Sequence, residues 1–226
     1  MVTEESALDP FHVQKFSDSV ADIVRQRILS GQMVAGGRIN EVALSDELRI
    51  SRSPLREALR SLNGEGLITL LPGKGAFVVE FDRQGILELS ELRLPLAVAI
   101  AGLAAERADQ DDVAAFEPIV SEISAAIRDP ALPYPFHIDF HELVARAAKS
   151  PRLAAAADEV ERQLRLARLR SGNTPERARN ALHEHLGLFE TIVKRDPIAA
   201  RKAMAEHISA GTASFLSLVE SQQSKS

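Results

Sequence analysis

The stretch from Val34 to Val78 constrains the fold of this chain more than any other segment. It contains two helical patterns separated by a tight turn, then two β-prone runs joined by a Pro-Gly-Lys-Gly turn: Glu41–Leu48, Ser53–Asn63, Leu67–Leu71 and Ala76–Val79. Helix, turn, helix and a hairpin closed by glycines are typical of a winged helix-turn-helix. The sequence therefore predicts a domain that binds double-stranded operator DNA.

The second helical pattern carries the residues expected to read that DNA. Ser53 precedes Pro54, which suits a helix N-cap followed by proline at the first helical position. Arg52, Ser53 and Arg56 would then occupy the helix end that enters the major groove. Arginine can bond guanine through two hydrogen bonds, and a hydroxyl at a helix N-terminus suits phosphate. The alternative is an ordinary helical hairpin with solvated arginines, which we expect for Arg60. Apolar residues at helical spacing predict a small core beneath: Leu44, Leu48, Ile50, Leu55, Leu59 and Leu62.

The overall charge does not favour DNA binding, but the positions of the basic residues do. The net charge is −5, whereas DNA-binding domains often carry a basic excess. Arg49, Arg52, Arg56 and Lys74 nevertheless gather in the helix-turn-helix and the wing. A patch this small predicts weak non-specific binding, so we expect a homodimer that reads paired half-sites.

Composition excludes several other classes of protein. The 226-residue chain has no apolar run long enough to span a membrane and no secretory signal pattern, so no membrane partner is expected. It contains no cysteine, which removes disulfides and thiolate metal ligands and fits a cytoplasmic protein. Aromatic residues make up only 4% of the chain, which argues against binding single strands by base stacking.

The chain changes character after about residue 82. Residues 83–226 show helical patterns with almost no strand signal, separated by breaks that contain proline: Ile86–Arg107, Asp111–Arg128, Pro135–Lys149, Arg152–Arg170, Pro175–Lys194 and Pro197–Glu220. We therefore predict a mainly α protein, in which a winged helix-turn-helix over residues 1–82 precedes an all-α bundle of about six helices.

Histidines are the chemically distinctive residues of this second domain. His137 and His141 are four residues apart and share one helix face, the spacing of helix-borne metal ligands. His183 and His185 cannot face the same way, and both flank the apolar face of their helix, so periodicity does not choose between them. The alternative is that these histidines are polar groups satisfied inside the bundle core.

Two segments of the N-terminal half carry a family resemblance. SRSPLREALRSLNGEGLITLLPGKGAFV resembles the DNA-binding signature of GntR-superfamily regulators, and DIVRQRILSGQMVAGGRINEVALSDEL resembles the segment before it. The resemblance implies that Arg52, Ser53 and Arg56 contact bases or phosphates. It also implies that Gly73, at the wing tip, approaches the minor groove. Val42 occupies a position that often holds arginine in the family, so the operator sequence of relatives cannot be transferred.

The C-terminal half resembles the FadR-type C-terminal effector domain, known as FCD, in its metal-binding form. The segments that carry this resemblance are ELRLPLAVAIAGLAAERA, FHIDFHELVARAAKS and LHEHLGLFETIVKRDPIAARKAMAEHI. It implies metal ligands at His137, His141, His185 and His207, with His137 where the family usually has an acidic residue. His183 has no counterpart and is predicted to lie on the surface. Imidazole ligands suit a divalent transition metal, zinc or nickel in particular.

The same resemblance implies that Arg93 faces a ligand cavity, where its guanidinium could pair with a carboxylate effector. Residues 83–226 would then form the effector-binding and dimerisation domain of a ligand-responsive transcription regulator, not an enzyme. The alternative is a metal-dependent hydrolase fused to a DNA-binding module. Glu142 and Glu184 adjoin expected ligands in that case, but neither falls in an HExxH arrangement.

Overall fold

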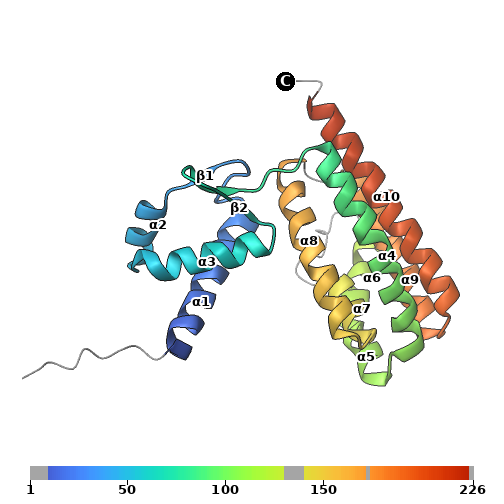
Figure 1. The fold of residues 1–226 in the computed structure, drawn as a ribbon. Coiled ribbons are helices and arrows are strands. Elements are labelled where there is room, and N and C mark those ends of the chain that lie inside the picture. Colours follow the sequence, from blue (N-terminus) through green and yellow to red (C-terminus); the bar gives the residue numbers. More distant parts are fainter. Residues whose placement is uncertain (1–9, 130–139, 172–173, 224–226) are drawn as a thin grey trace, which may run out of the picture. The chain divides into compact units, whose positions relative to one another are not determined.

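The chain folds into two compact units, the first made up mainly of the residues up to Phe81 and the second mainly of those from Asp82 onward. The computed structural model describes residues 10–129, 140–171 and 174–223. Figure 1 shows a small unit of three helices and a sheet, followed by a helical unit. A mainly α fold with an N-terminal winged helix-turn-helix is therefore confirmed.

The N-terminal unit contains three helices and a three-stranded antiparallel sheet in the order β1-β3-β2. Its elements are α1 (Pro10–Leu29), β1 (Arg38–Ile39), α2 (Glu41–Leu48), α3 (Arg52–Gly64), β2 (Ile68–Leu71) and β3 (Gly75–Val78). The hairpin β2–β3 is the predicted wing. The strand β1 was not predicted, because two residues are too few to show a period-two pattern.

Local hydrogen bonds explain where the two central helices begin and end. The Asn40 side chain caps α2 by accepting hydrogen bonds from the backbone of Val42 and Ala43, at 3.2 and 3.1 Å. Arg49 ends the helix in the left-handed conformation, with φ of 55°. The prediction that Ser53 caps α3 was wrong, because α3 begins at Arg52 and its N-cap is Ser51. Proline fits at the third helical position because the first backbone N–H groups of a helix lack intrahelical partners.

The predicted core of this unit is present. Leu44, Leu55, Leu59 and Leu62 are buried, and Leu48 and Ile50 pack against them while partly buried. From α1, β1 and the hairpin the same cluster receives Val24, Ile28, Ile39, Leu67, Ile68, Ala76 and Val78. This packing buries one face of α3 and leaves Arg52 and Ser53, its first two residues, exposed.

The C-terminal unit contains seven helices among the residues the structure describes, one more than predicted. They are α4 (Arg83–Arg107), α5 (Gln110–Ala115), α6 (Glu117–Arg128), α7 (Phe140–Ala147), α8 (Pro151–Ser171), α9 (Pro175–Val193) and α10 (Pro197–Gln223). The extra helix arises because the predicted 111–128 helix breaks at Phe116, directly before Glu117 and Pro118. Phe116 is itself buried, with 1% of its surface exposed, so the break between the two helices places its ring in the core.

The bundle is built around an apolar core shared by α4, α6, α7, α9 and α10, to which Phe116 between α5 and α6 also belongs. The long helices α4 and α10 run alongside each other in Figure 1. Gly102 leaves room for the guanidinium of Arg201, which a Cβ at this position would displace. Arg201 is in turn fixed by Glu106 at 2.8 Å. None of the described helices combines the length and the hydropathy that crossing a membrane requires.

Candidate functional site

The turn between α2 and α3 presents the predicted DNA-contacting residues to solvent. Arg49, Arg52, Ser53 and Arg56 are all exposed on this side of the unit. Arg56 differs from the others because its Nε donates a hydrogen bond to Glu41 Oε2 at 2.8 Å. This ion pair, which sequence reasoning missed, connects the first turn of α2 to α3.

Basic residues elsewhere in this unit are mostly neutralised by its own carboxylates. Arg25 pairs with Asp22 and Glu65, Arg27 with Glu47 at 2.8 Å, and Arg60 with Glu57. Within residues 16–81, where the side chains are described, the cations that form no ion pair with a described residue are Arg38, Arg49, Arg52 and Lys74. The unpaired positive charge therefore lies at the helix-turn-helix turn and on the sheet that forms the wing.

The wing tip has a backbone that glycine favours. Gly73 and Gly75 have φ of 72° and 100°, and the Lys74 N–H closes the turn by donating to the Leu71 carbonyl at 3.0 Å. A Cβ on Gly73 would meet nothing within 4 Å, so the tip is open on that side. Gly73 and Lys74 are both exposed, as contact with a nucleic acid would require.

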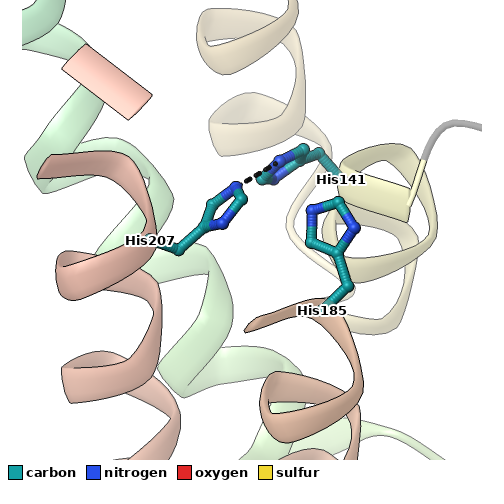
Figure 2. A group of neighbouring side chains, drawn as sticks. All are labelled: His141, His185 and His207. Carbon is teal, nitrogen blue, oxygen red and sulfur yellow. Dashed lines mark hydrogen bonds between the residues drawn. The ribbon is translucent and has the colours of Figure 1, made fainter. Parts of the chain in front are cut away.

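In the helical unit, three histidines from three helices converge. His141 lies on α7, His185 on α9 and His207 on α10, and each offers a ring nitrogen within 4.8 Å of the other two. Figure 2 shows the three rings facing one another, with His141 Nε2 and His207 Nε2 3.1 Å apart. His137 lies outside the described residues. His183 is exposed, as predicted, and His185 is the inward-facing member of that pair.

Burial keeps the inner histidines neutral, although the hydrogen bond with Glu184 acts in the opposite direction on His207. His185 and His207 are each only 7% exposed, and burial lowers the pKa of both, that of His185 to about 3. Burial opposes ionisation of Glu184 as well, but hydrogen bonds from His207 and Arg177 outweigh it and lower the pKa of Glu184 to about 2. A neutral His207 can donate its Nδ1–H to Glu184 Oε2, 2.6 Å away, and so direct the Nε2 lone pair toward His141.

The residues of this cluster fit a transition metal. His185 Nε2 is buried and has no hydrogen-bond partner, which is costly for an imidazole nitrogen. Three converging imidazoles are the ligands that zinc or nickel would take. Glu184 beside His207 matches the carboxylate that commonly orients a metal-bound histidine. Three protein ligands also leave a coordination position open.

A cavity of about 520 Å³ adjoins the cluster, and His141 belongs to both. Alanines of α4, α7 and α8 line it together with Ile100, Val144 and Met204, and its charged lining residues are Glu142, Arg146, Asp158 and Glu161. Arg93, the predicted effector-binding residue, is buried and ion-paired with Glu161. Arg93 therefore reaches the cavity wall through Glu161 and does not line the cavity itself.

The sequence did not predict that Arg177 and Glu184 would support the histidine cluster. Arg177 donates to both carboxylate oxygens of Glu184, at 2.9 and 2.6 Å, and to the backbone carbonyl of His207 at 3.3 Å. Arg177 and Glu184 are seven residues apart, which places them two turns apart on one face of α9. That spacing is the only sequence signal of the pair, and it occurs by chance in many helices.

Comparison with protein families matches both units. A model described as bacterial regulatory proteins, gntR family, matches residues 16–78, and a model of the FCD domain matches residues 88–210. The second match covers more than half of the chain.

Individual proteins give the same result. The uncharacterised HTH-type transcriptional regulator YdhC of Bacillus subtilis is 25% identical over 201 residues, which cover 88% of each chain. The galactonate operon transcriptional repressor of Escherichia coli is 28% identical over 221 residues, with 87% of this chain and 95% of the repressor covered. Among solved structures, E. coli McbR/YncC shares the fold, with a TM-score of 0.74 at 18% identity, over 92% of this chain and 98% of that chain.

Proposed function

The chain belongs to the gntR family of bacterial regulatory proteins and carries an FCD effector domain, and we propose that it senses a small organic acid beside a metal held by histidines. It is a ligand-responsive, DNA-binding transcription regulator and not an enzyme, since its domains and relatives are regulators. The hydrolase alternative has no support from these comparisons.

The observation that carries the proposal is the buried, unpartnered Nε2 of His185, close to ring nitrogens of His141 and His207. These three residues would hold a divalent transition metal, zinc or nickel, and His137 remains a fourth candidate ligand. By accepting the Nδ1–H of His207, the Glu184 carboxylate would fix the tautomer of that ring. Arg177 positions the Glu184 carboxylate by hydrogen bonding to it. When bound, the metal would supply a positive centre to which a carboxylate oxygen can bind.

The cavity that shares His141 with this cluster is the proposed effector site. Arg146 is the only arginine or lysine among its lining residues and could pair with a carboxylate. Arg93 becomes a second anchor if an effector takes the place of Glu161 on its guanidinium. A relative is named as the repressor of a galactonate operon, which makes sugar acids reasonable first probes.

Effector binding would regulate DNA binding only through different affinities for two arrangements of the protein. We propose a homodimer, because the winged unit offers few unpaired cations and paired half-sites would supply the missing affinity. A dimer that binds chromosomal operators would act in the bacterial cytoplasm.

The test compares His207→Ala with His183→Ala. His183 serves as the control because it is an exposed histidine of the same unit that lies outside the cluster, on the helix that carries His185. Full-length proteins loaded with zinc or nickel are titrated with an operator duplex, with and without galactonate, citrate or lactate. The proposal expects at least one acid to shift DNA affinity in the wild type and in His183→Ala but not in His207→Ala. A metal-free wild type that responds normally would remove the metal from the mechanism.

A further inference from the structure

Arg38 is a basic residue of the N-terminal unit for which neither the sequence patterns nor the proposed function supplies a role. It is the first residue of β1 and is exposed, while Ile39 beside it is buried in the core. In the antiparallel register Arg38 faces Phe77 of β3, so both side chains project from the outer face of the sheet. Gly75 lies two residues from Phe77 and therefore on that same face.

The Arg38 side chain runs across this face toward the wing turn. Its Nε and Nη2 atoms would lie 3.5 and 3.6 Å from a Cβ placed on Gly75, which is ordinary van der Waals contact. Gly75 directly follows the exposed turn residues Gly73 and Lys74. The guanidinium thus lies at the base of the wing, beside Gly75.

Exposure alone would not distinguish Arg38 from any solvated arginine. The distinguishing feature is the distribution of ion pairs: Arg25, Arg27 and Arg60, which lie on α1 and later in α3, are all paired with carboxylates. Arg38 makes no ion pair with any residue that the structure describes, a property it shares with Arg49, Arg52 and Lys74. An unpaired guanidinium keeps all its donors for an external anion.

We propose that Arg38 binds a phosphate of the DNA backbone from the base of the wing and so fixes the position of the wing on the duplex. A phosphate is favoured over a base edge because the guanidinium lies at the base of the wing and its fork of donors matches phosphate oxygens. This role rests on DNA binding by the winged unit and is independent of the proposed metal.

The test compares four full-length proteins: wild type, Arg38→Gln, Arg38→Lys and the control Arg60→Gln. The probes are a duplex that the wild type selects from a random-sequence pool and a scrambled duplex of equal length. Fluorescence anisotropy gives the dissociation constant of each over a series of salt concentrations, and thermal unfolding checks each fold.

We expect Arg38→Gln to weaken binding to both duplexes to a similar degree, on the order of tenfold. The slope of log affinity against log salt should shrink by about 0.9 for each phosphate that the variant no longer neutralises. Arg38→Lys should recover most of the slope, and Arg60→Gln should behave as wild type because Glu57 already neutralises Arg60.

Three results would overturn the proposal. The first is an Arg38→Gln protein with unchanged affinity and slope. The second is a weakening confined to the selected duplex, which would mean that Arg38 binds a base. The third is a lowered unfolding temperature together with equally weak binding by Arg38→Lys, which would give Arg38 a structural role.

Discussion

The two units of the protein use their cations differently. In the DNA-binding unit, most cations around the α2–α3 turn and the wing are exposed and form no ion pair with described residues. In the bundle, the arginines near the histidine cluster are buried and ion-paired. Arg52 and Lys74 represent the first arrangement. Arg93 with Glu161 and Arg177 with Glu184 represent the second. The same residue type thus serves opposite purposes in the two units.

This contrast indicates what each region is built to bind. Exposed, unpaired cations remain available to an external polyanion and release counterions when they meet it. In the bundle the buried charges of Arg93 and Arg177 are compensated by carboxylates, and the buried polar atoms without a hydrogen-bond partner include the neutral Nε2 of His185. A neutral lone pair among imidazoles suits a metal cation. The DNA-binding unit is therefore suited to an anion, and the histidine cluster to a cation.

The largest expected effect concerns the bundle. A bound metal stabilises the folded state by about 4 kcal/mol when its free concentration is about a thousandfold above the dissociation constant. Thermal unfolding of chelator-treated protein should therefore move to higher temperature when zinc or nickel is added. His207→Ala should lose this shift and His183→Ala should keep it. An identical unfolding temperature with and without metal in the wild type would break the contrast between the units.

The second effect concerns the DNA-binding unit and is of the order of 1–3 kcal/mol. Arg52→Ala should weaken specific operator binding by about that amount if the arginine forms a bidentate pair with a base. Arg56→Ala should cost less, because part of its hydrogen bonding is already given to Glu41. Arg60→Ala is the ion-paired control on the same helix and should bind as wild type. Equal affinity of Arg52→Ala and wild type in a quantitative binding assay would remove α3 from the interface.

The third effect is a pH dependence confined to the bundle. Burial lowers the pKa of His185 to about 3, below its ordinary 6.5, so the unfolded state binds a proton that the folded state rejects. The contribution of neutral His185 to the free energy of unfolding is fully present above about pH 6.5 and is lost as the pH falls toward 3. The free energy of unfolding should fall by about 2 kcal/mol at pH 5. Urea unfolding at pH 7 and pH 5, with chelator present, measures this loss. His185→Phe should flatten the dependence, and a slope as steep as that of the wild type would show that His185 is not its source.

The smallest effect concerns the ion pair that makes Arg56 an exception in its unit. Glu41→Gln removes an exposed pair, so the free energy of unfolding should change by only about 0–1 kcal/mol. Non-specific DNA binding should strengthen slightly, because a carboxylate leaves the interface and Arg56 joins the unpaired cations. Weaker binding to a scrambled duplex would instead mean that Glu41 orients Arg56 for contact with DNA.

Sequence reasoning predicted the regular parts of this fold well. The predicted helix Glu41–Leu48 has the bounds observed for α2, which the Asn40 cap and the left-handed Arg49 delimit. Two features of the fold were not predicted, for physical reasons. The strand β1 is defined by pairing with β3 and not by its own pattern, and the break at Phe116 is set by burial of its ring in the core.

The candidate site was predictable only in part. Helical spacing singled out His137 and His141, but His185 and His207 came from the family resemblance, since convergence of separate helices leaves no periodic signal. Burial distinguishes His185 from His183, which periodicity could not do. The pairing of Arg177 with Glu184 depends on side-chain rotamers, which a sequence pattern does not encode.

Metal content of the purified protein is the most direct test of the proposed histidine site. The full-length chain is stripped with chelator, incubated with zinc or nickel, passed over a desalting column and analysed by elemental mass spectrometry beside His141→Ala, His185→Ala, His207→Ala and His183→Ala. The three-histidine cluster predicts about one ion per chain in the wild type and His183→Ala, and a large loss in the other three. Wild-type protein that retains no metal, or histidine variants that retain as much as wild type, would contradict it.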